Sequence, residues 1–130
     1  MRIRFIILTL LLALAACAPA ELPFTLDDLP AGDAGSGAKI FLQSHDDAPP
    51  CSTCHTTDGS GGGTGPDMVG LGARAGSRVD GQSAEQYVFN SITRPGLYLV
   101  QGYSNLMYND YAKKLDPQDV ADLMAYVLSL

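Results

Sequence analysis

The sequence predicts an all-α domain, and three observations support this class. Residues 83–92 begin with Ser83 and carry Gln86 three residues later, the pattern of a helix-capping box. Residues 116–130 begin with Asp116 and Pro117, a favoured N-cap followed by a favoured first helical residue. No stretch alternates apolar and polar residues as a half-buried strand does, so the regular structure is expected to be helical.

Residues 1–16 have the composition of an export leader. Two arginines precede an apolar run over residues 5–14, which is too short to span a bilayer as a lasting helix. The following LAAC stretch at residues 14–17 resembles the lipobox of bacterial lipoproteins, in which the cysteine is lipidated and becomes the first mature residue. The alternative is ordinary cleavage that leaves Cys17 as a free thiol, a liability in an oxidising compartment. Lipid attachment at Cys17 is therefore favoured, on the extracytoplasmic (periplasmic) face of a bacterial membrane.

The next segment, residues 17–35, is predicted to be a flexible tether because it contains three prolines and three aspartates. A short helix is expected over residues 36–44, with Ser36 as its N-cap and with Ile40 and Phe41 facing the core. The predicted organisation is thus a signal peptide over residues 1–16, the tether, and one folded domain over residues 36–130.

The motif C-x-x-C-H at Cys51, Cys54 and His55 is typical of covalent haem c attachment. Two thiols at this spacing reach the two vinyl groups on one edge of a porphyrin. The imidazole that follows supplies the proximal nitrogen ligand of the iron.

Two other uses of this motif are weaker. A thioredoxin-like redox pair is expected within a βαβ unit, whereas glycine and proline surround this motif. A structural zinc site needs four nitrogen or sulfur ligands, and only Cys17 and His45 remain to complete one.

Further motifs resemble those of class I c-type cytochromes, in the same order along residues 37–130. Gly37-x-x-x-Phe41 resembles the signature of the family's N-terminal helix, and Leu123-x-x-Tyr126 that of its C-terminal partner. The resemblance implies three to four helices around one covalently bound haem c. It also implies that the glycine lets the two helices cross closely, with the two aromatic rings beside the crossing.

The resemblance also assigns roles around the cofactor. Pro66, within the TGPDM stretch at residues 64–68, corresponds to the proline whose carbonyl accepts a hydrogen bond from the proximal imidazole. Arg74 corresponds to an arginine near a haem propionate, although a solvated surface charge is an equal alternative.

Two departures from the family pattern are visible. An additional loop at residues 44–50 is expected beside the haem. The family's tryptophan is missing because the chain has no Trp. Tyr87, Tyr98 or Tyr103 could bond the propionate instead.

The sixth iron ligand separates an electron carrier from a protein that binds small molecules at the iron. Met107 lies in the loop before the last helix, where the family places its axial methionine. Met68 follows the GP pair at a position that is apolar in the family, and Met124 falls in the apolar stripe of the last helix, where Met commonly fills a core. Met107 is therefore the expected ligand. Met68, His45 and an open site are the alternatives.

The chain carries 8 Lys and Arg against 14 Asp and Glu, and loss of the leader would make its net charge of −6 two units more negative. This charge argues against a nucleic-acid partner. It agrees with a redox partner that has a basic docking patch, and a role in solubility alone is an equal alternative. No acid, base or nucleophile cluster accompanies the haem motif, so we expect an electron carrier rather than an enzyme. The alternatives are an open-site peroxidase or gas sensor, and a fixed haem subunit of a larger respiratory or photosynthetic complex.

Overall fold

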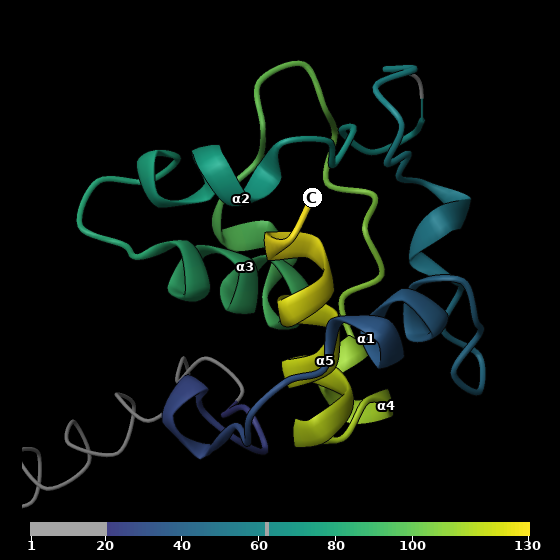
Figure 1. Cartoon of the computed structure of the whole chain (residues 1–130), viewed down its shortest axis with the longest axis vertical. Helices are drawn as coiled ribbons and strands as arrows, with labels where there is room; N and C mark the ends of the chain where they lie inside the picture. Colours follow the sequence, from purple (N-terminus) through teal and green to yellow (C-terminus); the bar gives the residue numbers. More distant parts are fainter. Residues whose placement is uncertain (1–20, 62) are drawn as a thin grey trace, which may run out of the picture.

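The computed structural model describes residues 21–61 and 63–130, which fold into helices joined by long loops (Figure 1). The described elements are, in chain order, η1 (Leu26–Asp28), α1 (Ala34–Phe41), η2 (Cys51–Thr53), α2 (Leu71–Arg74), η3 (Ala75–Ser77), α3 (Ala84–Thr93), η4 (Pro95–Leu97), α4 (Tyr111–Lys114) and α5 (Pro117–Leu128), where η denotes a 3₁₀ helix. These residues contain no strand; the only β feature among them is an isolated bridge between His45 and Ala48. The all-α prediction is confirmed.

The largest helix–helix contact joins α1 to α5 (Figure 1). At the crossing, a methyl group added to Gly37 would lie 2.0 Å from the carbonyl oxygen of Asp122, so the two backbones approach too closely for any side chain. Beside it, the rings of Phe41 and Tyr126 pack edge to face, with centroids 5.5 Å apart and planes at 66°. The expected glycine crossing with its two flanking rings is present.

Helix α1 begins earlier than the sequence pattern indicates. Its N-cap is Asp33, whose carboxylate accepts the backbone N–H of Ser36 at 2.7 Å, and the helix ends at Phe41. Ser36 was the wrong choice of cap, because an N-cap side chain binds the N–H three residues later. Ser36 instead supplies that N–H.

The prediction of a flexible tether over residues 17–35 is wrong for its described part, residues 21–35. Phe24 is 8% exposed and packs edge to face on Phe89 of α3, with centroids 6.3 Å apart. A methyl group on Gly32 would lie 2.2 Å from the carbonyl oxygen of Ala121. The buried carboxylate of Asp122 accepts the backbone N–H of Asp33 at 2.7 Å. The folded unit therefore starts well before residue 36, through long-range contacts that composition does not reveal.

Helices α3 and α5 begin where their capping residues place them. Ser83 accepts the backbone N–H of Gln86 at 3.1 Å, and Asp116 accepts that of Asp119 at 2.9 Å. The apolar stripe of α5 faces the core, where Val120 is fully buried. These two helices position the walls of the site described below.

Residues 1–20, with the predicted leader and Cys17, lie outside the described residues. Within the described part of the chain, no helix is both long and apolar enough to cross a bilayer.

Candidate functional site

A cavity of about 320 Å³ lies between the helices, and most of its wall is apolar. Cys51, Cys54 and His55 line it on one side, and core residues of the surrounding helices, such as Leu71, complete it. A cavity with an apolar wall and a few polar groups is the usual form of a cofactor site. The C-x-x-C-H motif therefore faces an interior of the kind that a porphyrin needs.

A single tight turn places the three residues of the motif together. η2 spans Cys51–Thr53, and the carbonyl of Cys51 accepts the backbone N–H of both Cys54, at 3.1 Å, and His55, at 3.0 Å. All three residues that this turn brings together line the cavity.

The two competing uses of the motif receive no support. Burial raises the pKa of the Cys51 thiol to about 11, whereas a redox-active dithiol needs a lowered thiol pKa. No group of three or more His, Cys, Asp or Glu side chains placed to hold a metal ion occurs among residues 21–61 and 63–130. A structural zinc site needs four such ligands.

His55 is held from behind by the segment that follows the glycine-rich loop at residues 59–63. Its Nδ1 atom lies 2.8 Å from the carbonyl oxygen of Pro66. A methyl group on Gly65 would lie 2.5 Å from Cε1 of the same ring, so the backbone rests directly against the imidazole. A carbonyl acceptor at Nδ1 leaves Nε2 free for a metal and fixes the ring orientation. The position of Pro66 agrees with the resemblance.

Asp67 organises the glycine-rich loop, a function that the sequence did not reveal. Its carboxylate accepts the Thr56 hydroxyl, the N–H of Val69 at 2.7 Å and the N–H of Gly59 at 3.1 Å. These bonds lower the pKa of Asp67, the Thr56 hydroxyl having the largest effect. The available signal was an acidic residue directly after a Gly-Pro pair, which is common to many turns.

Arg74 lines the cavity, but its guanidinium is bound to the main chain. It donates to the carbonyl of Val69 and, from Nη2, to that of Asp67 at 2.7 Å. Arg74 thus holds the segment after Pro66 in place. Its expected approach to a propionate stays a prediction.

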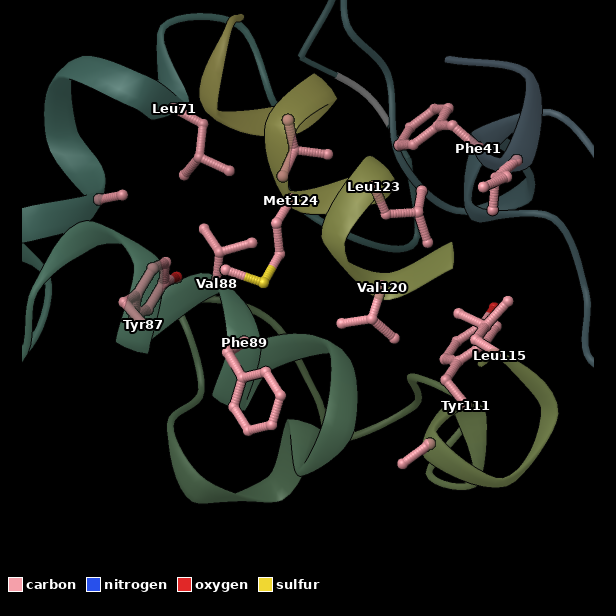
Figure 2. Close-up of a cluster of buried hydrophobic side chains, with 14 of the residues drawn as sticks. Phe41, Leu71, Tyr87, Val88, Phe89, Tyr111, Leu115, Val120, Leu123 and Met124 are labelled. Carbon is pink, nitrogen blue, oxygen red and sulfur yellow. The ribbon is translucent and has the colours of Figure 1, made fainter. Parts of the chain in front are cut away.

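Met107 and Met68 both line the cavity, whereas His45 is not among its lining residues. Met124 lies in the core beside Val88 of α3 (Figure 2), in agreement with its assignment as core filler. Two methionines therefore remain as candidates for an iron ligand.

The backbone distinguishes these two methionines. The N–H of Met68 donates to the carbonyl of Thr56, directly after His55, at 2.8 Å. Met68 therefore belongs to the same wall as the imidazole. Met107 comes from the separate loop between η4 and α4. Met107 is thus the cavity methionine that belongs to a different segment from His55.

The additional loop at residues 44–50 is tied to α4 and to the Met107 loop. The Tyr111 hydroxyl donates to the carbonyl of Pro49 at 2.6 Å, and Lys114 forms an ion pair with Asp47 at 2.6 Å. The Tyr108 hydroxyl also donates to Asp47, at 3.4 Å. Pro49 lines the cavity, so this loop does lie beside the site as expected. Its anchors join residues more than sixty positions apart and left no sequence signal.

The three tyrosines expected near a propionate, Tyr87, Tyr98 and Tyr103, all line the cavity. The rings of Tyr87 and Tyr98 pack edge to face with centroids 5.8 Å apart. They form the wall next to η4.

An all-α fold around an apolar cavity, with C-x-x-C-H on one wall and a carbonyl behind the histidine, defines a class I c-type cytochrome. The comparisons agree with this class. The family model for cytochrome c matches residues 34–130, so the chain belongs to the cytochrome c family. A curated cytochrome c of Nigella damascena is 27% identical over 116 residues, which cover 79% of this chain and 95% of that protein.

Membership of this family implies covalently bound haem c as the cofactor. The residues present fit that group. Two cysteines and a histidine face an apolar cavity, and glycine lies against the imidazole where a side chain would displace it. The family also implies electron transfer and redox proteins as partners.

Proposed function

We propose that this protein is a monohaem electron carrier, tethered to the extracytoplasmic face of a bacterial membrane, with His55 and Met107 as the iron ligands. The observation that carries the proposal is the origin of the two methionines that line the cavity. Met68 is bonded to the wall that holds His55, while Met107 comes from a separate loop. A histidine and a methionine together close the iron to outside ligands and raise its potential.

Bound haem c supplies the one-electron chemistry, as its iron alternates between two oxidation states. The polypeptide holds this group and controls its surroundings. Pro66 orients the His55 ring through the bond at Nδ1. Cys51 and Cys54 provide the covalent attachment. The apolar wall limits access of water and favours the less charged iron(II) state.

The oxidised absorption spectrum tests the ligand assignment. Iron(III) bound by a thioether has a weak sulfur-to-iron charge-transfer band at the red edge of the visible range. We expect this band in the wild-type protein, its loss with a lowered reduction potential in Met107→Ala, and its retention in Met68→Leu. Met107→His should remain six-coordinate at a lower potential. If Met68→Leu loses the band while Met107→Ala keeps it, the ligands are reversed.

The proposed tether depends on Cys17. Its support is the LAAC stretch at residues 14–17 after an apolar run. Mass spectrometry of the exported protein should find a mature N-terminus at Cys17 carrying lipid. Cys17→Ser should release the domain into the soluble extracytoplasmic fraction with an unchanged visible spectrum. A mature chain that starts after Cys17, or a free thiol there, contradicts the anchor.

We further propose redox partners with a basic docking patch. The net charge of −6 supports this choice, because complementary fields raise the encounter rate. The second-order rate of electron transfer to a basic partner protein should fall as salt is increased. A rate that does not change with salt, or that rises, would contradict docking by charge complementarity.

A further inference from the structure

Arg78 carries a buried polar atom that the polypeptide leaves unbonded. Its Nε atom is buried and has no hydrogen-bond partner among the described residues. The residue directly follows η3, and its backbone N–H donates to the carbonyl of Ala75 at 3.2 Å, which fixes where the side chain starts. A guanidinium is always charged, and burying a charged donor without an acceptor is unfavourable. Arg78 thus needs an acceptor from outside the described chain.

The direction of Arg78 indicates where that acceptor lies. Its side chain lines the same cavity as Cys51, Cys54 and His55. The carboxylate among the described lining residues is that of Asp67, which is already bonded to Thr56, Val69 and the glycine-rich loop. Neither ion pair found in the described chain involves Arg78. The missing acceptor therefore belongs to whatever fills the cavity.

Arg74 differs from Arg78 in this respect. The Arg74 guanidinium already donates to the carbonyls of Val69 and Asp67. An arginine whose donors are bound to main-chain carbonyls has few left for an anion. Of the two arginines on the cavity wall, Arg78 is the one with a buried donor available.

We propose that Arg78 binds a propionate of the haem and takes the place of the tryptophan that this chain lacks. The proposal rests on the proposed haem function. A propionate is a carboxylate, and the planar guanidinium matches a carboxylate with parallel N–H bonds. Tyr98 and Tyr103 line the same cavity and carry hydroxyl donors of their own.

The proposal has two electrostatic consequences. A fixed positive charge beside the haem stabilises the iron(II) state, which carries one positive charge less, so the reduction potential rises. The same charge favours the ionised propionate and moves its protonation to lower pH. The other charged or titratable lining groups that could contribute are Cys51, Cys54, His55, Asp67, Arg74, Tyr87, Tyr98, Tyr103, Tyr108 and Tyr111.

The test compares Arg78→Gln, Arg78→Lys and the control Arg94→Gln in the full-length holoprotein. Arg94 is exposed and does not line this cavity. Arg94→Gln removes the same charge as Arg78→Gln, so it serves as a control for net charge alone. The reduction potential is measured as a function of pH, and resonance Raman spectroscopy follows the propionate bending mode. We expect Arg78→Gln to lower the potential, to shift its propionate-linked pH step upward by about one unit or more, and to move the bending mode. Arg78→Lys keeps the positive charge, so its reduction potential should lie between those of Arg78→Gln and the wild type. Its propionate bending mode should still differ from that of the wild type, because lysine lacks the planar fork.

If Arg78→Gln matches Arg94→Gln in both measurements, the proposal is wrong. If Arg78→Gln does not yield holoprotein, Arg78→Lys decides alone: an unchanged bending mode overturns the proposal, and a shifted one supports it. Covalent haem in the wild type is checked first by acid-acetone extraction. Haem that washes out refutes the haem function itself, whereas retained haem with insensitive variants refutes only the role of Arg78.

Discussion

The two walls that supply the candidate iron ligands are built differently. Around His55, main-chain bonds link Gly65 to Cys54 at 2.9 Å and Met68 to Thr56 at 2.8 Å, and the Asp67 carboxylate gathers the loop between them. In the Met107 loop, the main-chain bonds of Tyr103 and Leu106 span only two or three residues. That loop also exposes apolar side chains, among them Leu106 at 68%.

The two walls should therefore differ in how well they tolerate substitution. The wall that holds His55 is fixed by glycine contacts and by a network closed over residues 54–69, so the imidazole position tolerates little change. The loop that holds Met107 is attached through Tyr108, whose hydroxyl donates to Asp47 and whose ring packs edge to face on Tyr111 of α4. Substitutions in the wall that holds His55 should therefore lower the free energy of unfolding more than substitutions around the Met107 loop.

Gly65→Ala should have the largest effect. The added methyl group would lie 2.5 Å from the His55 ring, so either the ring would have to leave its bond to the Pro66 carbonyl or the backbone would have to shift. We expect a loss of about 3 kcal/mol in the free energy of unfolding, as for severe overpacking, with a low yield of holoprotein. Chemical denaturation measures the loss. Gly76→Ala is the control, because its methyl group would meet nothing closer than 3.6 Å; equal losses in both variants would contradict the account.

Asp67→Asn should weaken the same wall in a pH-dependent way. The hydrogen bonds to Asp67 lower its pKa below the ordinary value of 3.8. The carboxylate therefore contributes its full stabilisation above pH 3.8 and loses it as the pH falls through the lower, folded-state pKa. We expect the Asp67→Asn variant to be less stable at neutral pH and to lose less on acidification than the wild type. Parallel acid-unfolding curves for the two proteins would refute this role.

Tyr111→Phe tests the second wall. It removes the hydroxyl that donates to the carbonyl of Pro49 and leaves that acceptor unpaired. A cost of about 1 kcal/mol in unfolding free energy is expected for one hydrogen bond. Tyr126→Phe serves as the control, since the packing of that ring on Phe41 is retained. Equal stabilities of the two variants would show that residues 44–50 are not held through Tyr111.

Lys114→Gln should have the smallest effect on stability. Its ion pair with Asp47 spans 2.6 Å, but the Asp47 side chain is 71% exposed, so water and salt screen the attraction. We expect unfolding curves that overlap with the wild type at physiological salt and separate slightly at low salt. A large loss at high salt would mean that the pair anchors the loop at residues 44–50.

Local patterns predicted the parts of this molecule that depend on local chemistry. The caps at Ser83 and Asp116 need only neighbours within three or four residues, and both are found where the sequence placed them. The predictions were weaker where burial depends on distant segments. Phe24 and the carboxylate of Asp122 are examples, because their partners lie more than sixty residues away in the chain.

The site shows the same division. The Pro66 carbonyl behind His55 was foreseen from motif order. The sequence does not show that Arg74 is bonded to main-chain carbonyls or that Arg78 has a buried donor. Both features become visible only in the three-dimensional arrangement of residues 67–78. Two arginines four residues apart look alike in sequence, and only their surroundings distinguish them.

The central claim is that Met107 binds the iron and keeps outside ligands away from it, as in an electron carrier. Exposing the reduced wild-type protein to carbon monoxide tests this claim most directly. We predict an unchanged visible spectrum over minutes, because a bound thioether blocks the open coordination position. Met107→Ala, treated in the same way, should bind carbon monoxide at once and shows that the assay detects access. Rapid binding by the wild-type protein would contradict the electron-carrier account and favour an open-site sensor or enzyme.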